Sequence, residues 1–86
     1  MQADEATLEL TVYSRTYCHL CDDMIAGLRT LQARFRFRMT IVDVDSDDAL
    51  DARYGEDVPV VAHGSRELCR HRLDVALVTD YLAKIG

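Results

Sequence analysis

The 86-residue sequence has no long apolar run, no basic N-terminal segment and no excess of positive charge. No stretch approaches the roughly 20 apolar residues that span a bilayer, so no transmembrane helix is expected. The first ten residues include Asp4, Glu5 and Glu9, so no signal peptide is readable and a cytoplasmic location is expected. The formal net charge of −5 argues against nucleic acid and anionic membrane surfaces as partners.

Internal repeats, low-complexity tracts and linkers are also absent. The length suits one domain, residues 1–86, in which the polar residues 1–6 are expected to fray. There are three cysteines, Cys18, Cys21 and Cys69. An odd number with one close pair, in a chain expected in a reducing compartment, indicates redox chemistry or metal binding rather than a secreted disulfide framework.

Hydrophobic periodicity predicts a strand and then a long helix in the first part of the chain. Apolar side chains alternate with polar ones over residues 8–13, which is typical of a strand. The next segment, from about Cys18 or His19 to Arg34, is predicted to be a helix. Its apolar residues are spaced by four, three and four positions: Met24, Leu28, Leu31 and Phe35.

A second strand is predicted over residues 39–44, followed by a short helix. Asp45 or Ser46 is expected to cap this helix, which should continue through Tyr54 and end at Gly55.

The last part of the chain predicts two strands and a helix. Residues 58–62 form a strand opened by the only proline, residues 63–65 a turn, and residues 66–70 a fourth strand. Asp74 is expected to cap a final helix with one shared apolar face: Val75, Val78, Leu82 and Ile85. The order is β-α-β-α-β-β-α, an α/β fold in which strands joined by helices pair in parallel and the last two form a hairpin.

The motif Cys18-His19-Leu20-Cys21 lies where a predicted strand ends and a helix begins. The first turn of a helix presents unpaired N–H groups and a partial positive charge, which stabilise a thiolate and lower the pKa of Cys18. Cys21, three residues later on the same side of the turn, is expected to be more buried and to act as the resolving thiol.

Neighbouring charges act on Cys18 in opposite directions. Arg15, and His19 when protonated, add positive potential. Asp22 and Asp23 add negative potential.

A metal site is the alternative use of such a pair. Zinc needs four ligands, and the sequence has no second Cys-x-x-Cys and no His-x₃-His. Cys69, His63 and His71 would complete a site only if the fold brought them together, and the predicted strand position of Cys69 argues against that.

Several residues outside the motif have a simple structural interpretation beside a functional one. Cys69 is expected to be a small buried residue, with a redox-regulatory thiol as the alternative. His63 is interpreted as a surface residue, and His71 as either an exposed residue or a ligand contact. Tyr54 and Tyr81 are expected to pack, and the acids of residues 43–51 to form a strand end, a helix cap and a solvated helix face.

Two segments resemble the active site of glutaredoxins. Residues 12–21, Val-Tyr-Ser-Arg-Thr-Tyr-Cys-His-Leu-Cys, are similar to the strand end and Ser-Lys-Thr-Tyr-Cys-Pro-Tyr-Cys of that family, and Asp57-Val58-Pro59 is similar to its Thr-Val-Pro. The resemblance is closest to the short glutaredoxin-like proteins of bacteria. It implies a thioredoxin fold, with a four-stranded mixed sheet and flanking helices, over nearly the whole chain.

The resemblance also implies roles for individual residues. Cys18 matches the attacking cysteine and Cys21 the resolving one. Arg15 matches the basic residue that binds a glutathione carboxylate, and Tyr17 the aromatic residue before the nucleophile. In the second segment, Val58 matches the residue whose backbone pairs with substrate, and Pro59 matches a cis-proline facing the cysteines.

The sequence departs from that family at two places. His19 replaces the proline of the motif, which allows a different redox potential. The glycines before the last helix are replaced by Arg70-His71-Arg72-Leu73, and only Asp74 has a counterpart. Side chains at these positions either obstruct the glutathione α-carboxylate or, through Arg70 and Arg72, bind a different acidic group.

We therefore predict a thiol–disulfide oxidoreductase acting on protein or glutathione mixed disulfides. The predicted substrate-binding residues besides the two cysteines are Arg15, Tyr17, His19, Val58, Pro59 and Asp74. No cofactor is expected to be bound permanently; glutathione or a reductase would regenerate the dithiol, and we expect a monomer. The alternatives are an iron–sulfur or metal carrier that uses Cys18, and a non-catalytic binding module.

Overall fold

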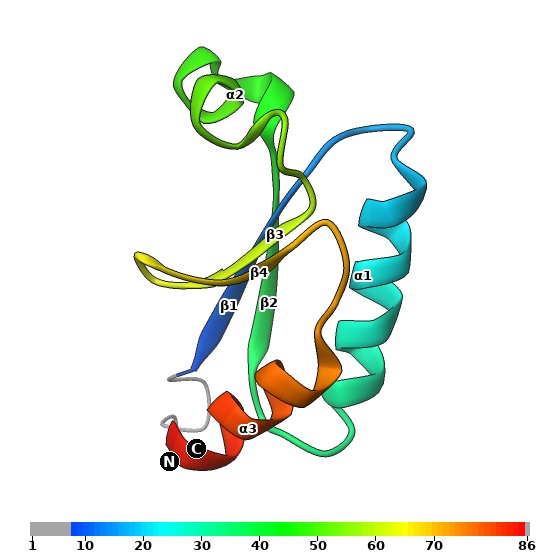
Figure 1. Ribbon diagram of the computed structural model, residues 1–86, viewed down its shortest axis with the longest axis vertical. Helices are drawn as coiled ribbons and strands as arrows, with labels where there is room; N and C mark the ends of the chain where they lie inside the picture. Colours follow the sequence, from blue (N-terminus) through cyan, green and yellow to red (C-terminus); the bar gives the residue numbers. More distant parts are fainter. Residues whose placement is uncertain (1–7, 86) are drawn as a thin grey trace.

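The computed structural model describes residues 8–85, so the expected fraying of residues 1–6 lies outside the described residues. A four-stranded sheet forms its centre (Figure 1), with strand order β2-β1-β3-β4. The bounds of these strands are Glu9–Ser14 (β1), Arg38–Asp43 (β2), Val60–His63 (β3) and Arg66–Arg70 (β4). The predicted succession of strands and helices is confirmed, as is the mixed sheet.

The strand directions match the prediction at two of three pairings. β1 and β2 pair in parallel, and β3 and β4 form the expected antiparallel hairpin, with an irregular register between Val61 and Ala62. β3, however, runs antiparallel to β1, although a helix joins it to β2. That helix, α2 (Asp48–Tyr54), lies beyond the end of the sheet (Figure 1) and does not carry the chain back along a face.

Two helices cover one face of the sheet and enclose the core. α1 (His19–Leu31) contributes Met24 and Leu28, and α3 (Val75–Ile85) contributes Val78 and Leu82. These side chains belong to one buried cluster with residues of β1 and β3: Leu10, Val12 and Val61. The core therefore lies between the sheet and both long helices.

The ends of the two long helices differ from the prediction. α1 ends at Leu31 rather than Arg34, and Phe35 packs against the core from outside the helix. On α3, Val75 and Ile85 are 50% and 44% exposed, because they lie at the two ends of a helix whose middle is buried. The predicted shared face is thus reduced to its two central residues.

The segment after β2 is capped differently from the prediction. A short 3₁₀ helix, η2 (Val44–Ser46), precedes α2, and the Asp43 carboxylate caps it by accepting the Asp45 N–H at 2.9 Å. Asp47, not Asp45 or Ser46, caps α2, because its carboxylate accepts the Ala49 N–H at 2.8 Å. Gly55 ends α2 as expected.

Tyr54 links α2 to the sheet. Its ring stacks on that of Tyr13 in β1, with centroids 4.0 Å apart and planes inclined by 14°. Among the helices within residues 8–85, none is long and apolar enough to cross a membrane.

Candidate active site

The structure brings Cys18 and Cys21 together as a disulfide at the start of α1. Their Cα atoms are 5.2 Å apart, and the Cys18 sulfur accepts the Cys21 N–H at 3.2 Å. Cys18 is the N-cap residue, with extended backbone angles, so its sulfur lies against the first-turn N–H groups. This is the position at which an unpaired donor and the helix dipole stabilise a thiolate.

The two sulfur-bearing residues differ in exposure. Cys21 is 1% exposed and packs beneath the first turn of α1, whereas Cys18 is only half-buried. A molecule in solution therefore meets Cys18 first.

Tyr17 and His19 flank Cys18 on the surface. Tyr17 is 100% exposed and has a φ of +61°, a left-handed conformation that is unusual for a bulky residue. His19, the first residue of α1, is also exposed. Neither side chain contributes to the core, so both are accessible beside Cys18.

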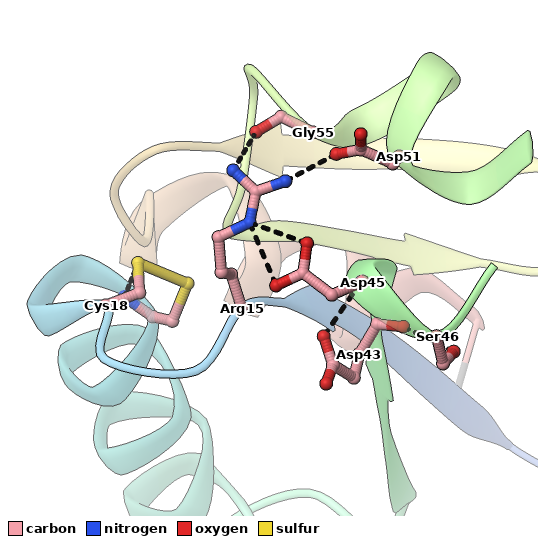
Figure 2. A network of polar contacts seen from close by, with 8 residues as sticks. Arg15, Cys18, Asp43, Asp45, Ser46, Asp51 and Gly55 are labelled. Atoms are coloured by element: carbon pink, nitrogen blue, oxygen red, sulfur yellow. Dashed lines mark hydrogen bonds and ion pairs between the residues drawn. A yellow bond between two sulfur atoms is a disulfide. The ribbon is translucent and has the colours of Figure 1, made fainter. Parts of the chain in front are cut away.

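Arg15 does not present its guanidinium to the solvent around the cysteines. Figure 2 shows it directed toward residues of η2 and α2. Nε donates to both carboxylate oxygens of Asp45, at 3.1 and 3.3 Å, and Nη1 donates to the Gly55 carbonyl at 3.2 Å. Nη2 donates to the Asp51 carboxylate.

This network was not predicted from the sequence, where Asp45 was interpreted as a helix cap and Asp51 as part of a solvated helix face. The signal was available in the topology. Parallel neighbours β1 and β2 end at the same edge of the sheet, where Ser14 pairs with Asp43. Arg15, the first residue after β1, and Asp45, the second residue after β2, are therefore brought together there.

Val58 and Pro59 precede β3, and the peptide bond between them is cis. Pro59 is buried and its carbonyl accepts the His71 N–H at 2.8 Å. Asp57, for which the sequence predicted no role of its own, forms an ion pair with Arg70 at 2.9 Å and lies 3.9 Å from His71. These contacts join the segment before β3 to the connection between β4 and α3.

A shallow hollow of about 250 Å³ separates that connection from the first turns of α1. Leu20, Asp23 and Met24 of α1 line one side, and His71 and Arg72 line the other. His71 has a φ of +68°, where the family resemblance places glycine. Arg70 is held by Glu67 as well as Asp57, and its pKa is raised mainly by the hydrogen bond to Glu67.

Asp74 caps α3, as predicted. Its carboxylate accepts the Leu77 N–H at 3.0 Å, so this side chain is used to cap the N-terminus of α3.

Cys69 and His63 are not part of the redox pair, which is formed by Cys18 and Cys21. Cys69 is a free, half-buried thiol on β4, and burial raises its pKa. His63 is not the surface residue that was expected: it is partly buried, and its Nδ1 lies 2.6 Å from the Tyr81 hydroxyl. Within residues 8–85, no three His, Cys, Asp or Glu side chains are grouped so as to hold a metal ion.

Comparison with known proteins relates this geometry to a family. The sequence profile described as Glutaredoxin-like domain (DUF836) matches residues 9–83. The solution structure of protein Ne2328 from Nitrosomonas europaea is 38% identical, with a TM-score of 0.80 over 87% of this chain and 91% of that one. Protein XcR50 from X. campestris is 36% identical, with a TM-score of 0.72 over 90% and 99% of the two chains.

More distant structures share the fold. The germline-specific thioredoxin Deadhead from Drosophila melanogaster is 24% identical, with a TM-score of 0.62 over 96% of this chain and 84% of that one. A search among curated proteins gave no significant match.

Proposed function

The chain belongs to the glutaredoxin-like domain family (DUF836), and on that premise we propose that it is a thiol–disulfide oxidoreductase whose dithiol is Cys18 and Cys21. One observation carries the proposal. The Cys18 sulfur caps α1 and accepts the Cys21 N–H, with the Cys21 sulfur within bonding reach. A half-exposed cysteine at a helix N-terminus, backed by a buried one, suits nucleophilic attack followed by resolution.

The first step forms a mixed disulfide. The Cys18 thiolate, stabilised by the Cys21 N–H and the helix dipole, attacks one sulfur of a substrate disulfide. The substrate S–S bond breaks, and the departing thiolate takes a proton from water. One substrate sulfur remains bonded to Cys18.

The second step releases the substrate. Cys21 loses its proton, attacks the Cys18 sulfur and forms the intramolecular disulfide found in the structure. The second substrate thiolate leaves and is protonated. The dithiol has then given two electrons to the substrate disulfide, and two external thiols, from two glutathione molecules or from the dithiol of a reductase, restore it and leave as a disulfide.

Three cysteine variants test the proposal in a disulfide-exchange assay with a protein disulfide and a glutathione mixed disulfide. Cys18→Ser should abolish exchange, and Cys21→Ser should accumulate a mixed disulfide that mass spectrometry detects. Cys69→Ser is the matched control, because Cys69 lies on β4 outside the redox pair, and it should retain exchange. Full activity of Cys18→Ser would refute the proposal.

A further inference from the structure

Each of the three guanidinium nitrogens of Arg15 donates a hydrogen bond to an acceptor within the protein. Nε binds the Asp45 carboxylate, Nη1 the Gly55 carbonyl and Nη2 the Asp51 carboxylate. The three acceptors come from η2, α2 and the residue that ends α2. Arg15, in the β1–α1 loop, is thus hydrogen-bonded to residues of η2 and the end of α2, which are 30 to 40 residues away in the sequence.

The positive charge of Arg15 is neutralised within this network. One guanidinium faces two carboxylates, so the group carries more negative than positive charge. The Arg15 side chain is 36% exposed, which leaves the pairing only partly screened by solvent. A ligand carboxylate approaching Arg15 would have to displace Asp45 or Asp51.

The side chains of Arg15 and Asp51 pack tightly against Gly55. A β-carbon at this position would lie 3.1 Å from Arg15 Nη2 and 2.5 Å from the Asp51 carbonyl oxygen, and it would collide with the Asp51 carboxylate. Position 55 therefore has room for the side chains of Arg15 and Asp51 because glycine has no β-carbon.

We propose that Arg15 is a positioning residue, which fixes the loop before Cys18 to α2, and that its neutralised charge leaves the redox site without carboxylate recognition at this position. The inference rests on the proposed function and narrows its substrate class. A small anionic disulfide gains nothing from Arg15, so a disulfide without carboxylates should be used as well as one that has them.

The experiment compares two substrates that differ only in charge. One is a peptide–glutathione mixed disulfide, and the other is the same compound with both glutathione carboxylates esterified. The wild type should use the two with similar kcat/KM. Asp45→Asn/Asp51→Asn keeps the shape of the network but removes both negative charges, and it should lower KM for the acid form alone, by about fivefold.

A matched variant separates this local effect from net charge. Glu9→Gln/Asp80→Asn removes two exposed acids away from Arg15, one at the start of β1 and one paired with Lys84 on α3, and it should not change the preference between the two substrates. Arg15→Gln and Arg15→Lys should lower kcat for both substrates to the same degree, because each loses the three-way attachment of the loop.

Two results would overturn the inference. One is a wild type that prefers the acid form by tenfold or more and loses that preference in Arg15→Gln. The other is loss of such a preference in Arg72→Gln, which would place carboxylate recognition at the hollow beside α1.

A second measurement keeps the inference testable if the chain catalyses no exchange at all. The rates at which iodoacetate and iodoacetamide alkylate reduced Cys18 report the local charge without any exchange. Asp45→Asn/Asp51→Asn should raise the iodoacetate rate relative to the iodoacetamide rate, and an unchanged ratio would contradict the inference independently of the proposed function.

Discussion

Replacing Gly55 by alanine has two opposing effects on the free energy of unfolding, one from backbone entropy and one from packing. Gly55 has φ −54° and ψ −35°, a helical conformation that alanine adopts freely. On that ground alone, Gly55→Ala should stabilise the protein by about 0.4–1 kcal/mol, because it restricts the unfolded chain.

The contacts around Gly55 predict the opposite sign. The new β-carbon would lie 2.5 Å from the Asp51 carbonyl oxygen and would collide with the Asp51 carboxylate, so the last turn of α2 must shift. Overpacking of this kind costs about 1–3 kcal/mol. The weakened ion pair with Arg15, which is partly exposed, adds at most about 1 kcal/mol.

Taking the middle of each range, the net expectation is a loss of about 2 kcal/mol in the free energy of unfolding. For a chain of this size the melting temperature should fall by about 5–20 °C. Circular dichroism during urea and thermal unfolding measures both quantities. Asp51→Ala in the same background should recover part of the loss, since it removes one of the two collisions.

Gly64→Ala is the comparison variant. Gly64 has a φ of +61°, and an added β-carbon would meet no atom within 4 Å, so alanine there should cost about 1 kcal/mol through backbone conformation alone. The reasoning about Gly55 is refuted if Gly55→Ala melts at or above the temperature of the wild type.

Three further predictions concern side chains outside the redox pair. Burial raises the pKa of Cys69, so its alkylation by iodoacetamide should accelerate only above about pH 8.5, where an exposed thiol ionises; a profile matching that of an exposed thiol would contradict this. Burial, and then a hydrogen bond to Tyr54, raise the pKa of Tyr13. Tyr54→Ala should therefore lower that pKa, followed by absorbance at 295 nm, and should cost about 1–2 kcal/mol in urea unfolding through the lost stacking. Tyr81→Phe removes the hydroxyl that lies 2.6 Å from His63 and should cost about 1 kcal/mol, whereas unchanged stability would show that this contact contributes nothing.

Local patterns were sufficient to predict most of the fold. The alternation in residues 8–13 and the apolar spacing after Cys18 identified β1 and α1, because one buried face imposes one period. The strand over residues 66–70 was predicted with its observed bounds.

The errors arose where several local solutions compete. Five aspartates lie between residues 43 and 51, and each is a chemically adequate cap, so the sequence did not single out Asp47. The direction of β3 depended on where α2 lies in space, which its seven residues do not encode.

The site was predictable in its chemistry but not in its long-range contacts. The motif located Cys18 and Cys21 because their relationship is local to one helical turn. The partners of Arg15 are 30 to 40 residues away, and a sequence pattern does not show which of many acids will neutralise a given cation.

The burial of Cys21 has a kinetic consequence. In the reaction proposed above, the accessible sulfur of the oxidised protein is again that of Cys18, so the reductant must attack the same atom that the substrate meets in the reduced protein. Substrate and reductant then cannot be bound at once, and each acts as a competitor of the other. The catalytic cycle should follow ping-pong kinetics, with parallel double-reciprocal plots and inhibition by an excess of either partner.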